Sequence, residues 1–213
     1  MNISFLTSGF PNGFTDEFIR CIKDCYNNNG LFTFIASDFE QHSKTDKYIE
    51  TFLKMFESKG IVFNESYIID SRTTSQEAIK YIDKSDIVWI SGGDTLKQIR
   101  NLKEYNLIPA LQNRNGITIG MSAGSINMAK KVVLAKDVND NIPELSIYSG
   151  IGLVDINVEP HLDSASEEHM KEIYEASHHA VIYGICDSSF IKIVNESIEI
   201  YGTYFKYENI PYK

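Results

Sequence analysis

The most informative segment of this 213-residue chain reads Ile119-Gly120-Met121-Ser122-Ala123-Gly124-Ser125. Its apolar beginning predicts a strand over 117–121, and the residues after it predict a helix over 123–130. Gly-x-Ser-x-Gly between a strand and a helix is typical of a nucleophile elbow, a sharp turn that exposes a serine hydroxyl. Gly120 and Gly124 leave room for the neighbouring strand and helix. An ordinary strand-to-helix turn without chemistry is the alternative.

The surroundings of Ser122 favour negative charge. A helix N-terminus carries unpaired N–H groups and a positive partial charge, so it stabilises an adjacent anion. The Ala123 N–H follows the serine directly, which is the usual position of an oxyanion donor. Ser122 is therefore a candidate nucleophile, with Ala123 as one half of an oxyanion hole.

A second loop has a similar setting. The apolar run 87–90 predicts a buried strand, and Ser91-Gly92-Gly93-Asp94-Thr95 leads from it into a predicted helix. Two glycines let a ligand approach the backbone closely, and their N–H groups can complete an oxyanion hole. Asp94 or Thr95 can instead cap the helix, and a plain capped loop is the alternative. The spacing of a phosphate-binding P-loop is absent.

Short apolar runs alternate with amphipathic segments along the chain. Strands are predicted at 3–7, 31–36, 67–69, 87–90 and 117–121, and helices at 15–28, 46–58, 75–82, 95–102, 108–114 and 123–130. This alternation predicts a three-layer α/β fold, a mostly parallel sheet with helices on both faces. Further strands at 132–135, 152–158, 181–185, 190–194, 198–201 and 204–206, with a helix at 166–176, predict antiparallel pairing toward the C-terminal part.

Composition limits the partners. The 20 Lys and Arg against 29 Asp and Glu give a net charge of −9, and the basic residues are scattered. Nucleic acid and anionic membrane are therefore not expected as partners. Three cysteines do not form a disulfide framework, and no apolar segment is long enough to span a bilayer. We expect one cytoplasmic domain over residues 1–213, without linker, signal peptide, metal or cofactor.

A serine nucleophile needs a base and an acid. His161 follows a predicted strand, at the kind of position where sites assemble in open α/β sheets. The other four histidines are expected at the surface: His42, His169, His178 and His179. A carboxylate must then orient the imidazole, and the candidates are Asp137, Asp163 and Asp187.

Five segments, in order, resemble the serine-peptidase family of aspartyl dipeptidase (peptidase E) and cyanophycinase. They are Ile90-Ser91-Gly92-Gly93-Asp94-Thr95, Gly120-Met121-Ser122-Ala123-Gly124-Ser125, Gly150-Ile151-Gly152-Leu153-Val154, Pro160-His161 and Gly184-Ile185-Cys186-Asp187. Together they cover about half of the chain. The pairing of the first two motifs, at this separation, makes the resemblance fairly specific.

The resemblance implies a class I glutamine-amidotransferase-like α/β fold and a Ser-His-Glu triad in that chain order. Ser122 matches the nucleophile and His161 the base. Asp187 stands where the family usually has glutamate, and aspartate is one methylene shorter. The oxyanion donors would be the N–H groups of Gly93 and Ala123, and no cofactor is implied.

Two further departures concern the substrate. Asp94 stands where the family often has asparagine, and with Gly92 it is a candidate substrate-binding residue, its carboxylate suited to a free α-amino group. The aspartyl dipeptidases carry an arginine in the helix after the histidine, which suits bidentate binding of an aspartyl carboxylate. Residues 164–176 hold no arginine here, and Lys171 lacks that fork geometry.

The leading hypothesis is a serine hydrolase that cleaves short peptides through an acyl-enzyme, with Ser122, His161 and Asp187 as the triad. An α/β-hydrolase esterase is the nearest alternative, and its chain order would select Ser122, Asp137 and His161. A non-catalytic binding or regulatory protein that kept the elbow is the third. A glutamine amidotransferase would need cysteine at position 122.

Overall fold

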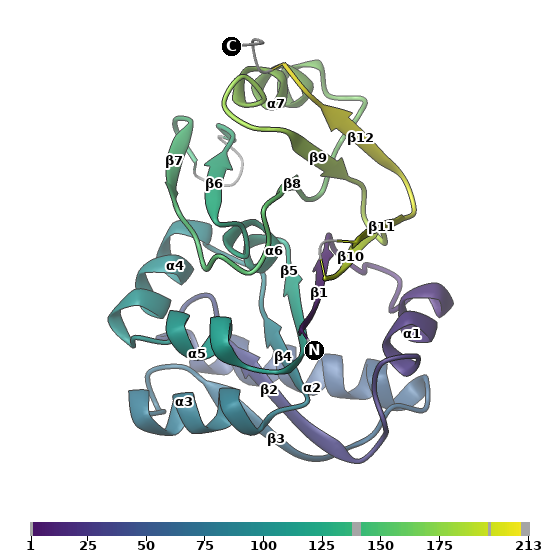
Figure 1. The fold of residues 1–213 in the computed structure, drawn as a ribbon, viewed down its shortest axis with the longest axis vertical. Coiled ribbons are helices and arrows are strands. Elements are labelled where there is room, and N and C mark those ends of the chain that lie inside the picture. The colour runs from purple at the N-terminus through teal and green to yellow at the C-terminus, as the bar shows by residue number, and fades with distance from the viewer. Residues whose placement is uncertain (1, 138–141, 196, 210–213) are drawn as a thin grey trace.

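The computed structural model describes residues 2–137, 142–195 and 197–209. Seven strands of this part form the central sheet, in the order β11-β10-β1-β5-β4-β2-β3 (Figure 1). Their bounds are Asn2–Thr7 (β1), Gly30–Ile35 (β2), Phe63–Ile69 (β3), Ile87–Ile90 (β4), Gly116–Met121 (β5), Phe190–Val194 (β10) and Ser197–Tyr201 (β11). Strands β1 to β5 are parallel, while β10 and β11 run antiparallel at one edge. The predicted mixed sheet is confirmed.

Helices cover both faces of this sheet because successive side chains of each strand point to opposite faces. Phe5 of β1 and Trp89 of β4 pack in one cluster with α1 (Asp16–Lys23) and α2 (His42–Ser58). Leu6 and Ile90, one position further along, pack in another cluster on the opposite face. That face holds α3 (Ser75–Lys84), α4 (Thr95–Glu104), α5 (Ile108–Asn113) and α6 (Ala123–Asn127). The fold is the predicted three-layer α/β arrangement.

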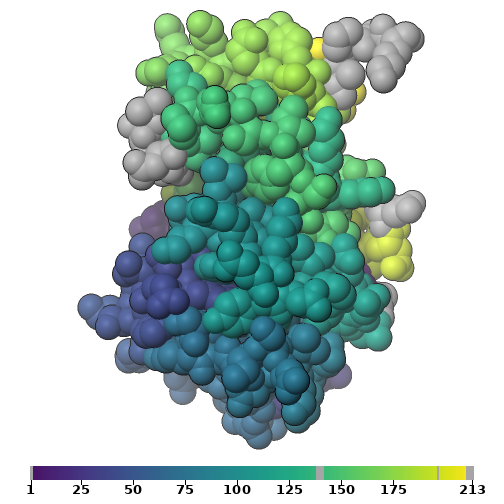
Figure 2. Space-filling view, turned by 90° about the vertical axis from the view of Figure 1, so that its left-hand side faces the viewer, coloured from purple at the N-terminus to yellow at the C-terminus, as the bar shows by residue number. Residues whose placement is uncertain are grey.

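The C-terminal part adds elements beyond the carboxyl ends of β1 and β5 (Figure 1). Strands β8 (Asn157–Glu159), β9 (Ile182–Ile185) and β12 (Tyr204–Tyr207) form a small sheet, and β6 (Lys131–Leu134) pairs with β7 (Ser146–Ser149). Helix α7 (Glu167–Ala176) packs beside them. Figure 2 shows these green residues stacked above the blue N-terminal part. The predicted antiparallel pairing is found between β9 and β12 and between β6 and β7, whereas β8 and β9 are parallel. The separation of these strands from the central sheet was not predicted.

Several element bounds differ from the prediction. Helix α1 ends at Lys23 rather than 28, before a run of asparagines in which Asn29 adopts a positive φ of 71°. Helix α6 ends at Asn127, where the Ile151 N–H donates to the Asn127 carbonyl at 2.7 Å. The segment around Ile151 bonds the end of α6 in this way, and the predicted strand over 152–158 is reduced to β8, which begins at residue 157 and ends at 159.

One helix begins earlier than the sequence pattern indicated, and one strand was not predicted at all. Helix α2 starts at His42, one turn before the predicted start, and β7 was not predicted. In β7 Ile147 is 44% exposed, so the strand lacks the apolar face that sequence patterns detect. Among the described residues, none of the helices has both the length and the apolar character needed to cross a membrane.

Candidate active site

Strand register brings the two predicted loops together. Met121 pairs with Thr7 of β1, and Gly120 pairs with Ile90 of β4. The residues that leave these three parallel strands therefore meet at one edge, with Ser122 in the middle. This is the edge of an open α/β sheet where ligands generally bind.

The turn at Ser122 has the geometry of an elbow. Ser122 adopts φ 49° and ψ −115°, a region that residues other than glycine rarely occupy. Such a backbone costs about 1–3 kcal/mol and persists only where its surroundings hold it. Here the Ser122 N–H donates to the Thr7 carbonyl at 2.9 Å, and the Ser125 hydroxyl accepts from the Thr7 N–H at 2.8 Å. The predicted elbow conformation is confirmed.

Both glycines of the motif are required by space. A Cβ at Gly120 would lie 2.7 Å from the carbonyl carbon of Gly124. A Cβ at Gly124 would overlap the carbonyl oxygen of Ile90, which belongs to the backbone of β4 and cannot swing away. The close approach of α6 to β5 and to β4 thus depends on glycine, which has no Cβ, at these two positions.

Gly124→Ala is expected to lower the free energy of unfolding by about 1–3 kcal/mol or more, because the added methyl presses on backbone rather than on a flexible side chain. Urea denaturation measures the change. Gly184→Ala is the matched control, since a Cβ there meets the ends of the Leu162 side chain at 3.0 Å, which can rotate aside. Equal losses in the two variants would contradict the explanation.

The second loop lies against the serine. A Cβ at Gly92 would be 3.2 Å from the Cβ of Ser122, and Gly93 adopts a φ of +135°, which only glycine occupies readily. Among the hydrogen bonds of the described residues, none uses the N–H of Gly93. Ala123 is the first residue of α6, where the N–H has no partner within the helix. Both N–H groups are therefore available to an oxyanion.

A buried polar network ties the Gly92–Gly93 loop to α6. The Gln98 amide donates to the Ser91 carbonyl at 2.7 Å, and the Asn127 amide donates to the Thr95 carbonyl at 2.9 Å and to Gln98 Oε1 at 3.0 Å. The Tyr148 hydroxyl donates to Asn127 Oδ1 at 3.0 Å. Burial raises the pKa of Tyr148 far above its ordinary value, so the phenol remains a donor. The network fixes the two loops relative to each other.

Gln98→Leu is expected to destabilise the protein by about 1–3 kcal/mol, because it leaves the Ser91 carbonyl and the Asn127 amide buried without their partner. Differential scanning calorimetry measures the loss. Gln112→Leu is the control: Gln112 is exposed and donates one hydrogen bond, to the Ile151 carbonyl at 2.6 Å. A loss in Gln98→Leu no larger than in this control would contradict the role of the network.

The predicted base and one of the predicted acids form a pair. His161 Nδ1 lies 2.6 Å from Asp187 Oδ1, and both side chains are about half exposed. The two residues follow the parallel strands β8 and β9, and the Leu162 N–H donates to the Ile185 carbonyl at 3.1 Å, which keeps the strand ends in register. Among the described residues no hydrogen bond joins the Ser122 hydroxyl to the His161 ring.

Asp187 is held as a carboxylate. Burial raises its pKa, but hydrogen bonds from the Ser8 hydroxyl and the Gly9 N–H, together with the charge and hydrogen bond of His161, outweigh burial and leave the pKa below its ordinary value. An ionised carboxylate only accepts hydrogen bonds, so the proton between the pair is on His161 Nδ1. In the neutral ring Nε2 is then the basic nitrogen.

The other two candidate acids have different partners. Asp137 Oδ2 lies 3.8 Å from His169 Nδ1, and Asp163 Oδ1 accepts from the Ala165 N–H at 3.0 Å. The side chain of His169 is only 18% exposed, so the prediction of a surface residue was wrong for it. Partial burial also makes the prediction wrong for His42, which bonds the Ser71 hydroxyl.

Asp94 is the N-cap of α4. Its Oδ1 accepts from the Lys97 N–H at 2.8 Å, so the capping role predicted for Asp94 or Thr95 belongs to Asp94. Gly92, Gly93 and Asp94 also line a cavity of about 250 Å³, together with Lys44 of α2 and other residues. Another cavity of about 250 Å³ lies beside His161, with Asp163 in its lining.

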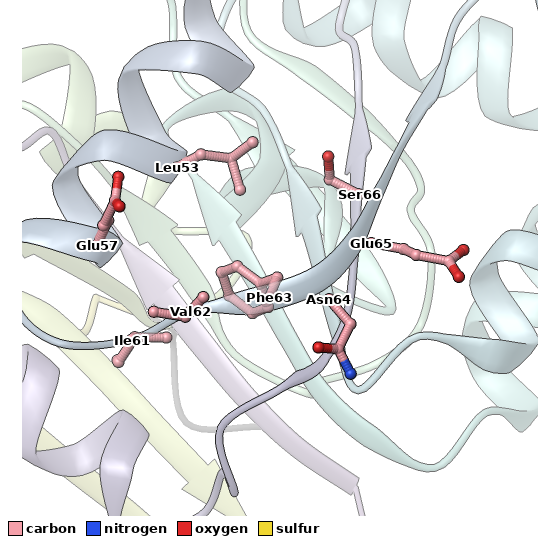
Figure 3. Close-up of a pocket in the computed structure, with 8 residues that line it drawn as sticks. All are labelled: Leu53, Glu57, Ile61, Val62, Phe63, Asn64, Glu65 and Ser66. Atoms are coloured by element: carbon pink, nitrogen blue, oxygen red, sulfur yellow. The ribbon is translucent and has the colours of Figure 1, made fainter.

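A further hollow lies at the opposite end of the sheet. Figure 3 shows it between α2, which contributes Leu53 and Glu57, and the start of β3 around Phe63. Strand β3 is parallel to β5 through β2 and β4, so its start is remote from the Ser122 edge. None of the predicted site residues lines this hollow.

Comparison with known proteins identifies the family. The model of peptidase family S51 matches residues 7–201. The chain belongs to peptidase family S51. The matched range includes both loops, His161 and Asp187, so the resemblance seen in the motifs is confirmed.

Curated relatives in this family are named peptidase E. One from Salmonella arizonae is 23% identical over 130 residues, which are 55% of this chain and 56% of the relative. One from Haemophilus influenzae is 25% identical over 133 residues, 57% of this chain and 56% of the relative. The matches thus span about half the length of these relatives.

Two solved structures share the fold of this S51 chain. A candidate peptidase E from Listeria monocytogenes EGD-e superposes with a TM-score of 0.69 and 22% identity, and 94% of this chain covers 98% of that one. A peptidase from an acI-B1 actinobacterium superposes with a TM-score of 0.69 and 14% identity. The match covers 99% of this chain and 92% of the other. At these identities the likeness concerns the fold.

The Ser8 and Gly9 contacts were missed at the sequence level. A signal was present, because Thr7-Ser8-Gly9 are small and polar residues at the carboxyl end of the first predicted strand. Without strand order, however, no pattern indicates that this end lies beside Asp187, which is 178 residues from Gly9.

Proposed function

We propose that this S51 chain is a serine peptidase that hydrolyses short peptides through an acyl-enzyme. The observation that supports this best is the 2.6 Å pair of His161 and Asp187, which lies against the Ser8–Gly9 turn after β1, while β1 itself pairs with β5, the strand that ends in the strained Ser122 elbow. Family membership supports a peptidase, while the triad and the substrate class are part of the proposal.

The first step is attack of Ser122 Oγ on the carbonyl carbon of the scissile bond, while His161 Nε2 accepts the hydroxyl proton. Asp187 accepts from Nδ1, which orients the ring and stabilises the imidazolium. The Ser122 hydroxyl and the imidazole move into hydrogen-bond distance on substrate binding, as catalytic groups commonly do. The N–H groups of Gly93 and Ala123 bind the oxyanion of the tetrahedral intermediate.

His161 then donates its proton to the departing amine, and the acyl group stays on Ser122. Water, deprotonated by the same imidazole, attacks the ester, and the serine leaves with the proton. Since the leaving amine must face His161, the cavity beside that residue receives the leaving group. The acyl part then lies along Gly92, beside the cavity that Asp94 lines.

The substrate is a short peptide without a required aspartyl residue. Asp94 uses Oδ1 as a helix cap, and its second oxygen is proposed to accept from the free α-amino group. Helix α7 holds Lys171 as its fixed cation, exposed to solvent, and no arginine that could bind a carboxylate through two bonds. A net charge of −9 and three free cysteines support one soluble domain in the reducing cytoplasm.

The test is hydrolysis of a peptide panel containing Asp-Xaa, Glu-Xaa, neutral, β-aspartyl and Xaa-Lys dipeptides, together with labelling by a fluorophosphonate that reacts with activated serines. We expect turnover of at least one member and labelling of the wild type but not of Ser122→Ala. Absence of both turnover and labelling would favour the binding or regulatory alternative. An esterase-only result, with ester substrates cleaved and every peptide refused, would overturn the peptidase assignment.

A further inference from the structure

We propose that Ser8 is a positioning residue, whose single hydroxyl holds His161 and Asp187 in register and lets the shorter aspartate serve as the triad acid. This inference rests on the proposed function. It concerns a buried side chain directly after β1 that lines neither of the two substrate cavities described above.

The Ser8 hydroxyl accepts one hydrogen bond and donates another. Its oxygen accepts from the backbone N–H of His161 at 2.8 Å, and its hydrogen is donated to Asp187 Oδ1 at 2.9 Å. The side chain is fully buried, so water cannot replace either bond. One small group thereby connects the ends of β1, β8 and β9, which belong to two different sheets.

The backbone of His161 needs this support. His161 adopts a φ of +55°, in the left-handed region that costs free energy for any residue except glycine. A hydrogen bond to its own N–H holds that conformation, and the conformation determines where the imidazole points. Ser8 therefore acts on the ring through the histidine backbone as well as through Asp187.

The same turn positions the carboxylate. Asp187 Oδ1 accepts from the Ser8 hydroxyl, from the Gly9 N–H at 3.0 Å and from His161 Nδ1. The chain is drawn close here, because the Ser188 N–H donates to the Gly9 carbonyl at 2.7 Å and the Ser8 N–H donates to the Ser189 carbonyl at 3.2 Å. These bonds bring the backbone of Asp187 inward, which offsets its missing methylene.

Gly9 shows how little space remains. A Cβ there would lie 2.9 Å from both Asp187 Oδ1 and His161 Cε1. The turn after β1 therefore touches both members of the pair at once.

The experiment compares Ser8→Ala with Ser85→Ala. Ser85 is another buried serine, and its hydroxyl forms a hydrogen bond with the Thr33 hydroxyl at 2.7 Å. It lies at the other end of the sheet. We expect Ser8→Ala to lower kcat by roughly tenfold to a hundredfold, in line with the cost of a small misplacement of a catalytic group, while KM changes little. Ser85→Ala should lower stability without changing kcat.

A second readout does not need turnover. The Nδ1–H proton of His161, assigned by its loss in His161→Gln, should give a low-field resonance in proton NMR that shifts or disappears in Ser8→Ala and stays in Ser85→Ala. A folded Ser8→Ala protein with unchanged kcat and unchanged resonance overturns the inference. If no peptide is hydrolysed at all, the proposed function fails and the resonance alone decides the role of Ser8.

If Ser8→Ala does not fold, Ser8→Cys replaces it. Cysteine keeps a small side chain at this position, but its somewhat larger thiol is a weak donor and a weak acceptor. We expect the same shift of the resonance and the same direction of change in kcat. Wild-type values for both in folded Ser8→Cys would overturn the inference.

Discussion

Ser122→Ala is expected to lower kcat on the best dipeptide by about 10⁶-fold, the loss typical when the nucleophile of a serine-protease triad is removed. Alanine deletes only Oγ, and the elbow depends on the Ser122 N–H and on Ser125 rather than on the lost oxygen. The variant should therefore fold and bind substrate as the wild type does. Steady-state kinetics, with substrate binding measured by calorimetry on the inactive variant, checks both statements.

Ser125→Ala is the informative companion. Its hydroxyl accepts from the Thr7 N–H and donates to the Gly120 carbonyl at 2.7 Å, which lies within the elbow. This serine is fully buried and supports the turn without facing the substrate. We expect it to lose stability and to keep far more activity than Ser122→Ala. If the losses in kcat were exchanged between the two serines, the assignment of the nucleophile would be wrong.

Asp187→Asn is expected to lower kcat by about 10⁴-fold, the second largest effect in this protein, because an amide fails to orient and stabilise the imidazolium as a carboxylate does. The carboxylate is ionised from well below neutral pH, since its pKa is below the ordinary value. The loss should accordingly be present throughout the pH range above the ordinary pKa of an aspartate. A pH–rate profile of the variant and the wild type measures it.

Asp137→Asn distinguishes the two candidate triads, in which the acid either follows His161 in the sequence, as Asp187 does, or precedes it, as Asp137 does. Asp137 lies beside His169 rather than His161, so its amide variant should keep most of the activity. A larger loss in Asp137→Asn than in Asp187→Asn would favour the esterase order of Ser122, Asp137 and His161.

Much of the chemistry was visible in short segments. The elbow and the Gly92–Gly93 loop are local features, because a strand, a few small residues and a helix within a dozen positions dictate their backbone. Helix caps are local in the same way: Thr15 caps α1, and Thr74 forms a capping box with Glu77 at the start of α3, although that box was not predicted. The residue pattern of such features is local, so sequence reasoning finds them, although bonds to Thr7 hold the Ser122 turn in the folded chain.

Local sequence was enough to predict the alternation of strands and helices and the turn at Ser122, and to single out His161 as a candidate base. Residue patterns left three candidate acids, and the family resemblance selected Asp187. The folded chain was needed to show that Asp187 lies beside His161, where α6 ends, and that Ser8 bonds both residues. These outcomes depend on the register of segments far apart, 26 residues for the His161–Asp187 pair and 153 for His161 with Ser8. A hydrogen bond across such separations exists only once strand order and packing bring the strand ends to one edge, and no local pattern encodes that distance.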